Sequence, residues 1–472
     1  PMKPIKALLM VLLTLAAANG VSAASTRATA SAERRPLSEE EAWIARVWRS
    51  PIFLRELLGT YGARSDIEPK ISDEDREILN RALLLLGRPG GREPARRMLE
   101  QIAGPQRSAA LDFTIGNIHL QTGAFDRAIL WYRRAVAKFP SFLRAHKNLG
   151  LALVRQNAFE EAIEPLTRTI ALGGGDGLTY GLLGFAYAQT ERWVSAETAY
   201  RQAMVLQPQV LDWQLGLARV VFRLRKFEEA AGLCEELIRN EPDRADYWLL
   251  LANAWLGMKQ PLKAAEIYEW LRFNGTAAAD HLFTLGDIYV NERYPDLAAE
   301  VYLEAYARAS EGAELRLLRA AEALAQRDGA AEAGRLLEAL PPDSLARLQA
   351  AEKSRYYQLQ ARLAAARGAA TEEQIRWLER AAEQDPLDGD VFLLLGRRYA
   401  EQGDVERAML QYERAAALES HAAEALLRQA QLRVRQRQFA EAIPLLKRSL
   451  DLRPREDVAR YLENVERLAR PR

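Results

Sequence analysis

Apolar residues recur at helical spacing along most of the chain, in paired blocks that a short polar turn separates. The turns include Gln121-Thr122-Gly123 and Gln402-Gly403-Asp404, whose glycines and polar side chains are typical of tight loops. Each pair of blocks therefore predicts a hairpin of two α-helices.

Small residues repeat in phase with these blocks. Twelve residues separate two small positions, and the pair recurs at steps of 34 residues: Gly116 with Ala128, Gly150 with Ala162, Gly184 with Ala196, Ala218 with Ala230, Ala252 with Ala264, Gly286 with Ala298, then Gly396 with Ala408 and Ala430 with Ala442. A small side chain lets two helix backbones approach closely where they cross. The pattern therefore predicts the same crossing in every hairpin.

The period defines ten units that end near Glu456. They start at Ala109, Leu143, Gly177, Leu211, Ala245, Ala279, Ala313, Arg355, Gly389 and Ala423. From Ala298 to Ala408 there are 110 residues, which is three periods plus eight, so we expect an insertion around Pro341-Pro342-Asp343-Ser344. Units seven and eight are degenerate, because Glu332 and Gln374 replace the usual alanine.

The third unit has the most complete pattern of large and small residues: Tyr180, Leu183, Gly184, Tyr187, Ala196, Tyr200, Ala203 and Pro208. This pattern resembles the tetratricopeptide repeat. The resemblance covers residues 109–456 and implies an all-α fold, an α-solenoid of about ten helical hairpins with end caps. It further implies a right-handed superhelix whose first helices line a concave groove.

The amino terminus has the features of a secretory signal. Lys3 and Lys6 precede an apolar run at residues 7–18, and Val21-Ser22-Ala23 offers the small residues of a cleavage site. The run is shorter than the roughly 20 residues that a spanning helix needs. We expect residues 1–23 to be removed and the mature chain to be exported without a membrane segment; an uncleaved anchor is the alternative.

The remaining chain divides around the repeats. Residues 24–72 form an extension whose apolar part, from Trp43 to Tyr61, docks either on the chain's own first repeats or on a partner. The expected order then continues with these parts: a capping or degenerate hairpin at 73–108, units one to six at 109–312, degenerate units seven and eight at 313–388, units nine and ten at 389–456, and a capping helix at 457–472.

Composition excludes several classes of protein. At 49% hydrophobic residues the chain is too apolar to be mainly disordered. Its 65 basic and 64 acidic residues nearly cancel, so the chain has no large net positive charge that would attract nucleic acid. One cysteine and four histidines without ligand spacing argue against a metal site. Because no catalytic or phosphate-binding motif is present, we expect no enzyme activity and no cofactor.

The resemblance implies which residues face the groove. In peptide-binding members of the family, the inward positions of a unit include the fifth, sixth, ninth and twelfth. Carried onto this sequence they are Phe113, Asn117, Leu120, Lys147, Asn148, Leu151, Phe185, Leu215, Arg219, Phe222, Leu249, Asn253, Leu256, Phe283 and Asp287. Asn117 and Asn148 occupy positions that hold a peptide backbone in the family. The alternative is that some of the apolar residues pack between neighbouring first helices.

These observations favour an exported scaffold for protein interactions. Its groove takes an apolar or amphipathic segment of a protein or peptide partner, and it resembles periplasmic accessory proteins of bacterial envelope assembly or transport machines. A second hypothesis is a structural element that self-associates into a homo-oligomer through the segment from Trp43 to Tyr61 or through an end cap, with no groove ligand.

Overall fold

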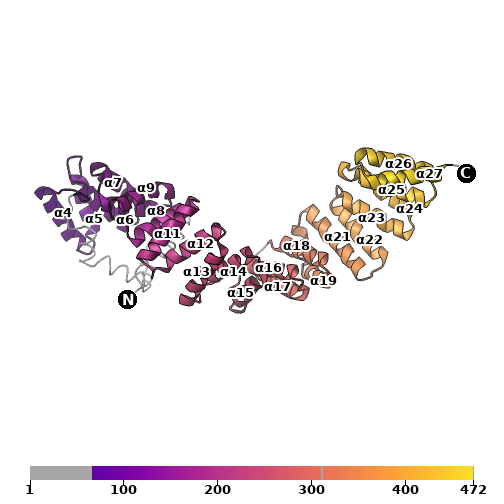
Figure 1. Ribbon diagram of the computed structural model, residues 1–472, viewed down its shortest axis with the longest axis horizontal. Helices are drawn as coiled ribbons and strands as arrows, with labels where there is room; N and C mark the ends of the chain where they lie inside the picture. The colour runs from indigo at the N-terminus through magenta and orange to yellow at the C-terminus, as the bar shows by residue number, and fades with distance from the viewer. Residues whose placement is uncertain (1–65, 310–311, 471–472) are drawn as a thin grey trace, which may run out of the picture. The chain divides into compact units, whose positions relative to one another are not determined.

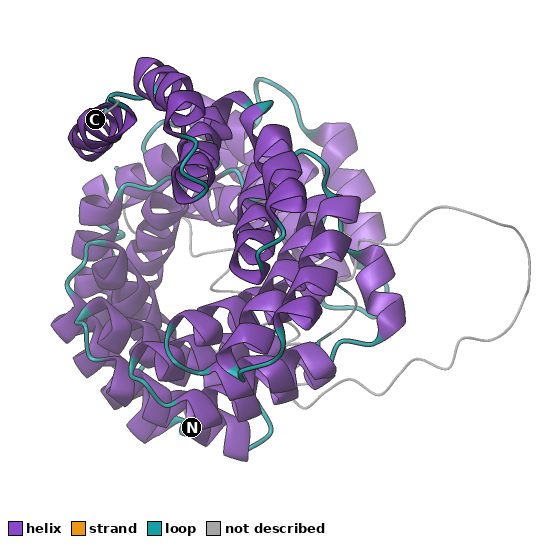
Figure 2. Ribbon diagram, turned by 90° about the vertical axis from the view of Figure 1, so that its right-hand side faces the viewer, coloured by secondary structure: helices purple, strands orange, loops and turns teal. Residues whose placement is uncertain are grey.

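The computed structural model describes residues 66–309 and 312–470, and within these ranges the chain forms 24 helices and no strand. Helices follow one another in chain order with short loops between them (Figure 1), and no other regular element is drawn (Figure 2). The prediction of an all-α fold of repeated hairpins is confirmed. Residues 1–65 lie outside the described residues, and with them the expected signal peptide at 1–23 and the segment from Trp43 to Tyr61.

The contacts divide the chain into two compact units, Pro1–Gln260 and Pro261–Arg472. The described helices of the first unit are α4 (Asp73–Leu86), α5 (Arg92–Ile102), α6 (Ala109–Gln121), α7 (Phe125–Lys138), α8 (Leu143–Arg155), α9 (Phe159–Ala171), α10 (Gly177–Gln189), α11 (Trp193–Leu206), α12 (Leu211–Arg223), α13 (Phe227–Asn240) and α14 (Ala245–Gly257).

The second unit continues the same arrangement. Its helices are α15 (Pro261–Phe273), α16 (Ala279–Asn291), α17 (Pro295–Arg308), α18 (Glu314–Gln326), α19 (Ala330–Glu338), α20 (Pro342–Arg347), α21 (Ala350–Ala366), α22 (Thr371–Gln384), α23 (Gly389–Gln402), α24 (Val405–Ala416), α25 (Glu419–Arg435), α26 (Phe439–Leu452) and α27 (Glu456–Ala469). The short helix α20 contains Pro342 to Ser344, where the period gains its extra residues.

Four hairpins close on a glycine that faces a tyrosine ring, at Gly116, Gly184, Gly286 and Gly396. In the α6–α7 hairpin the fully buried ring of Tyr132 lies against Gly116, and a Cβ on that glycine would sit 2.6 Å from Tyr132 Cε1. Gly184 faces Tyr200 in the same way, at 2.9 Å from the ring. The close crossing therefore depends on glycine, as the spacing of small and large residues predicts.

The turn between the two helices of a hairpin contains one residue with a left-handed backbone. Its φ is 75° at Gly123, 61° at Asn157, 58° at Glu191 and 61° at Arg225. The next residue donates its N–H to a carbonyl five residues back, at 2.8 Å from Arg192 N to Tyr187 O. This bond caps the first helix, and it recurs with residues such as glutamate and arginine that have no preference for this conformation.

Successive hairpins pack on one another through clusters of buried apolar side chains. Phe113 of α6 packs against Phe142 at 4.9 Å and Tyr132 at 5.8 Å between ring centroids, and Leu166 of α9 belongs to the same cluster. At the amino-terminal end, Leu99 of α5 packs into the cluster around α6. At the other end, Val458 and Val465 of α27 lie in one cluster with residues of α25 and α26. The terminal helices thus cover apolar surface of the outermost repeats.

Candidate functional site

The predicted binding residues lie on the first helix of each hairpin. Within the first unit, polar side chains join neighbouring first helices: Asn148 Nδ2 donates to Asn117 Oδ1 at 2.8 Å, and Arg219 pairs at 3.7 Å with Asp246, which was not among the predicted residues. We call the surface formed by the predicted positions of α6, α8, α10, α12 and α14 the first-helix face. Equivalent positions of stacked repeats point the same way, so side chains from successive hairpins line it.

Most apolar members of this face are half-buried. Phe185 packs edge-to-face on Phe159 with ring centroids 5.4 Å apart, and Phe222 packs on Phe227 at the same distance. Each ring therefore keeps part of its surface accessible while its orientation is fixed. The half-buried predicted residues of the first unit are Leu120, Lys147, Asn148, Leu151, Phe185, Phe222, Leu249 and Leu256.

Three predicted residues lie in the core and offer no surface to a partner. Phe113 is 1%, Phe283 4% and Leu215 7% exposed. Phe113 fills the space between two hairpins, whereas Phe283 packs beside Tyr302 with centroids 6.0 Å apart. For these residues the structure corrects the groove assignment: the fifth position of their units packs against neighbouring helices.

Asn117 is also buried, within a small polar network. The Tyr132 hydroxyl donates to Asn117 Oδ1 at 2.7 Å, and this oxygen accepts the bond from Asn148 as well, while Asn117 Nδ2 has no partner among the described residues. Burial raises the pKa of Tyr132, so its hydroxyl stays a donor. Tyr302 repeats the arrangement in the second unit, where its hydroxyl donates to Asp287 at 2.7 Å. The ninth position is thus oriented by a tyrosine fifteen residues later.

Lys147 is engaged by the chain itself. Its ammonium lies 2.5 Å from Asp176 Oδ2, and Asp176 also caps α10 by accepting the Thr179 N–H at 2.8 Å. Burial raises the pKa of Asp176, but the hydrogen bonds from Lys147 and Thr179 outweigh that effect and hold the pKa below its usual value. A partner that used Lys147 would have to compete with this ion pair. The exposed predicted residues are Arg219, Asn253 and Asp287.

The segment before α4 contributes contacts that the repeat pattern does not predict. Ile67 O accepts the Leu143 N–H at 3.2 Å, and the Glu68 carboxylate binds the Arg144 guanidinium through two bonds of 2.7 and 2.6 Å. Arg144 lies over the Phe113 ring at 5.3 Å. Residues 66–70 fall outside the 34-residue period, so no sequence signal marked them. The chain therefore covers the amino-terminal end of α8 with its own backbone.

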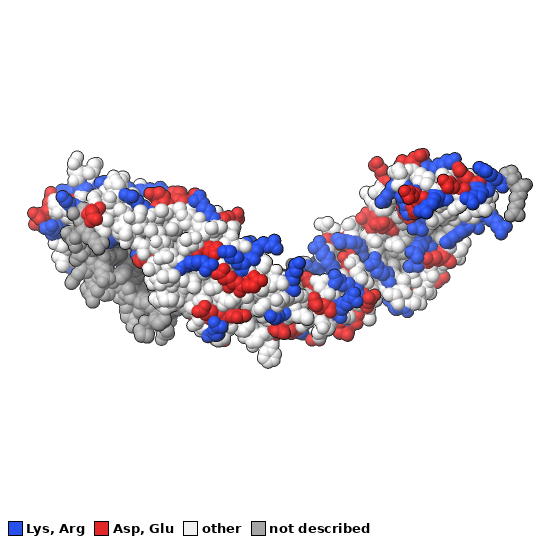
Figure 3. Space-filling view, in the orientation of Figure 1, with Lys and Arg blue, Asp and Glu red and all other residues white. Residues whose placement is uncertain are grey.

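The chemistry available on this face is that of binding. Apolar side chains alternate with amides and with charges of both signs, and acidic and basic residues are interspersed over the surface in view (Figure 3). Within residues 66–309 and 312–470, no group of three His, Cys, Asp or Glu side chains is placed to hold a metal ion. Among the same residues, no helix combines the length and apolar character needed to cross a membrane.

Comparisons with known proteins agree with the repeat. One tetratricopeptide repeat family model matches residues 95–141, 113–177 and 393–457, and a second matches residues 187–254. A comparison with curated protein sequences gives no match.

Solved structures give matches of low identity. A tetratricopeptide repeat protein from Parabacteroides merdae is 16% identical, with 50% of this chain and 94% of that chain covered and a TM-score of 0.35. MamA from Desulfovibrio magneticus is 22% identical over 37% of this chain and 99% of its own, with a TM-score of 0.34. YrrB, described as a TPR protein with an unusual peptide-binding site, is 17% identical over 34% and 84%, with a TM-score of 0.33.

The two family models fall on hairpins whose small and large residues recur every 34 positions, and the chain is a tetratricopeptide repeat protein.

Proposed function

We propose that the protein is an exported scaffold that holds an apolar or amphipathic segment of a partner protein on its first-helix face. Tetratricopeptide repeat proteins are in general non-catalytic and bind proteins or peptides. The proposed setting is the periplasm, where the protein serves as an accessory part of a bacterial envelope assembly or transport machine.

The observation that carries the proposal is the row of half-buried apolar side chains from α8 to α14. Phe185 and Phe222 are held by edge-to-face packing, so a partner segment meets rings that are already ordered and loses little side-chain entropy on binding. Arg219, on the same helix as Phe222, supplies a polar contact beside the apolar row. An amphipathic helix or extended peptide has the matching chemistry.

Site-specific crosslinking tests the binding face. A photoreactive phenylalanine at Phe222 should capture one protein in cells, and the same residue at Val194 of α11, which is 69% exposed, is the control position. Phe222→Glu should then weaken binding of the purified partner at least tenfold by calorimetry, whereas Val194→Glu should leave it unchanged. Equal crosslinking at both positions, or unchanged affinity of Phe222→Glu, would contradict the proposal.

The fold must be intact in these variants. Phe283, at 4% exposure, is unsuitable for the test because a glutamate there would disrupt the core. Circular dichroism and the melting temperature of Phe222→Glu should match those of Val194→Glu. Light scattering of the purified chain provides a separate readout: a stable oligomer without any partner would favour the self-associating alternative.

Export is tested independently. Residues 1–30 fused to an alkaline phosphatase that lacks its own signal should yield active enzyme outside the cytoplasm, because that enzyme folds only in an oxidising compartment. Replacing Leu9 and Leu13 with arginine should abolish the activity, since it breaks the apolar run. Activity that persists in this variant would argue against a secretory signal.

A further inference from the structure

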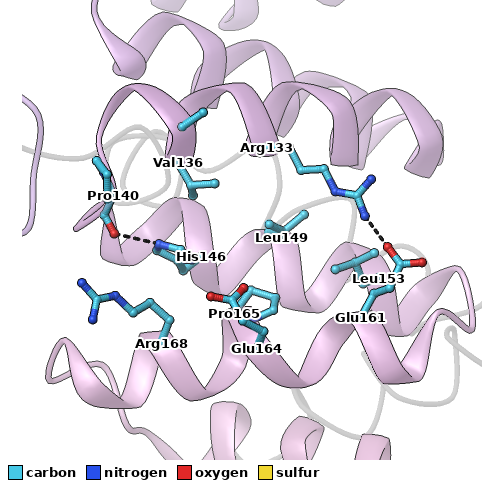
Figure 4. Close-up of a pocket in the computed structure, with 11 residues that line it drawn as sticks. Arg133, Val136, Pro140, His146, Leu149, Leu153, Glu161, Glu164, Pro165 and Arg168 are labelled. Carbon is cyan, nitrogen blue, oxygen red and sulfur yellow. Dashed lines mark hydrogen bonds and ion pairs between the residues drawn. The ribbon is translucent and has the colours of Figure 1, made fainter.

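A pocket of about 720 Å³ lies between the second helices α7 and α9, away from the positions that define the first-helix face. Its floor is formed by α8 through His146, Leu149 and Leu153, and its walls carry Val136 of α7 and Pro165 of α9 (Figure 4). All of these residues lie in one compact unit. The proposed function does not use this pocket.

The pocket is lined by His146, at a position where three other repeats have a larger aromatic side chain and where α6, α12 and α16 have Asp112, Gln214 and Leu282. His146 is the fourth residue of its helix, and the fourth residues of α10, α14 and α23 are Tyr180, Trp248 and Phe392. Trp248 Nε1 donates to Pro242 O at 2.8 Å; His146 Nε2 lies 3.0 Å from Pro140 O, again six residues back. The imidazole therefore reproduces the hydrogen bond of the indole without its six-membered ring. The side chain at this position is therefore smaller here than in the α14 repeat, and it borders an open pocket.

The walls define what can enter this space. Arg133 is paired with Glu161 across the opening, whereas Glu164 and Arg168 of α9 have no ion-pair partner among the described residues. The charges of these four side chains sum to zero, so the pocket does not favour a guest with a net charge. His146 Nδ1 is likewise without a partner, and the residue is 6% exposed. The guest must fit an apolar floor and offer a donor to an acceptor such as the Glu164 carboxylate.

We propose that this pocket binds the indole of a tryptophan side chain from a partner protein. An indole supplies a flat apolar body and a single N–H donor with no acceptor, which matches an apolar floor and the carboxylate of Glu164. Its face can also lie under the guanidinium of Arg168, as Trp131 lies under Arg134 with 4.2 Å between the ring centroid and Cζ. The indole of Trp248, at the equivalent position of α14, is the chain's own example of this side chain beside a carbonyl six residues back.

The binding test uses the full chain and N-acetyl-5-fluorotryptophanamide, observed by ¹⁹F NMR. Binding should be saturable, with half-saturation on the order of 0.1–1 mM for a ligand of this size. The 1-methyl analogue, which lacks the N–H donor, should bind at least fivefold more weakly, and so should the probe to Glu164→Ala. Equal affinity of the methylated probe, or no saturation below 10 mM, would overturn the proposal.

Two variants close the pocket by different routes. His146→Trp fills it with the chain's own indole, and should abolish probe binding while keeping or raising the melting temperature. Ala137→Phe fills it from an exposed rim position, where the substitution does not disturb the core, with Ala171→Phe at the exposed end of α9 as the matched control. Undiminished binding in both filled variants would place the probe elsewhere and overturn the assignment.

The same assay decides between guests. N-acetyltyrosinamide and N-acetylargininamide should bind several-fold more weakly than the indole probe, and tighter binding of either would overturn the choice of indole. Trp43→Phe/Trp48→Phe removes two tryptophans of the chain's own extension. Saturable binding that appears only in this double variant would identify the extension as the occupant and contradict a partner's tryptophan.

Discussion

At the scale of single residues, the hairpin depends on a glycine that faces a ring. Tyr132 cannot move away from Gly116, because its ring is fully buried beside Phe113 and its hydroxyl is bonded to Asn117. A methyl group on Gly116 would lie 2.6 Å from Tyr132 Cε1, closer than any relaxed contact. The α6–α7 crossing is therefore intolerant of even the smallest side chain.

Gly116→Ala should lower the free energy of unfolding by about 1–3 kcal/mol through overpacking. Gly232→Ala is the matched control: this glycine lies inside α13, and no atom comes within 4 Å of the position that an added methyl group would take, so alanine should stabilise the helix there by about 0.5–1 kcal/mol. Urea unfolding followed by circular dichroism measures both. If both substitutions changed the free energy of unfolding in the same direction, the result would contradict the close contact between Gly116 and Tyr132.

A buried ion pair is the second residue-scale feature. Asp112 is fully buried and pairs with Lys138, with Arg134 at 3.4 Å. Burial raises the pKa of Asp112, although Lys138 and Arg134 act in the opposite direction. A raised pKa means that the folded chain holds this proton more tightly than the unfolded chain, so the contribution to stability falls as pH rises through the folded pKa.

Lys138→Met removes the main compensating charge and should lower the free energy of unfolding by about 3 kcal/mol at pH 7, because the buried Asp112 carboxylate keeps only the longer contact with Arg134. Without Lys138 the pKa of Asp112 rises further. The substitution should therefore lower the free energy of unfolding by less at pH 5, where the carboxyl takes up a proton. Urea midpoints of both chains at the two pH values measure this difference. Lys138→Arg keeps the charge and should change the free energy of unfolding little. A destabilisation by Lys138→Met that is the same at both pH values would show that the charge on Asp112 is not its cause.

The groove assignments show where residue-level prediction reaches its limit. Phe113, at the fifth position of its unit, and Phe222, at the twelfth, were both predicted to face the groove. Phe113 is fully buried, whereas Phe222 is half-buried. Phe113 lies beside Phe142 and beneath Arg144, which Glu68 holds from outside the repeats. Burial depends on neighbours that the period does not describe, whereas the Gly–Tyr crossings depend only on residues within one hairpin and were predictable.

At the scale of elements, the turn fixes the geometry of the hairpin. Glu191 has φ 58° between α10 and α11, and its side chain is exposed. A left-handed conformation costs an L residue roughly 1–2 kcal/mol, which the packing of the two helices must offset. Glu191→Gly should raise the stability by about 0.5–1 kcal/mol, since the relieved strain exceeds the greater freedom of glycine in the unfolded chain.

The control for this change is Gln202→Gly, at an exposed position inside α11, where glycine should destabilise by about 0.5–1 kcal/mol. Thermal melts of both variants measure the difference. A destabilised Glu191→Gly chain would show that the turn carries no strain.

Several helix starts were predictable from the sequence to the residue, as at Leu143 and Gly177. Two first helices begin earlier than expected: α21 begins at Ala350, ahead of Arg355 in the degenerate part, and α25 begins at Glu419, ahead of Ala423, although the small residues of its unit keep the period. Both helices have 17 residues, because local propensity extends them beyond the length that the repeat specifies. The 34-residue period of small and large residues indicates where two helices cross, but it does not indicate how long each helix is.

At the scale of the whole molecule, stability is close to a sum over repeats and their interfaces, so the weakest repeat opens first. In the second unit this is the degenerate part. Helix α19 has 9 residues and α20 has 6, whereas α16 has 13 and α17 has 14. Short helices have little stability of their own, and α19 has only Ala333, Leu336 and Leu337 buried.

Hydrogen–deuterium exchange of the full chain should therefore be at least tenfold faster in α19 and α20 than in α16 and α17, which corresponds to an opening free energy about 1.4 kcal/mol lower. The comparison is internal, because all four helices belong to one compact unit. In α16 and α17 the Gly286–Tyr302 crossing locks the hairpin, while α18 and α19 present Ala320 and Leu336 at the corresponding positions. Uniform protection across these helices would mean that the unit opens as a single cooperative block, and that loss of the glycine–tyrosine contact in one repeat is compensated by its neighbours.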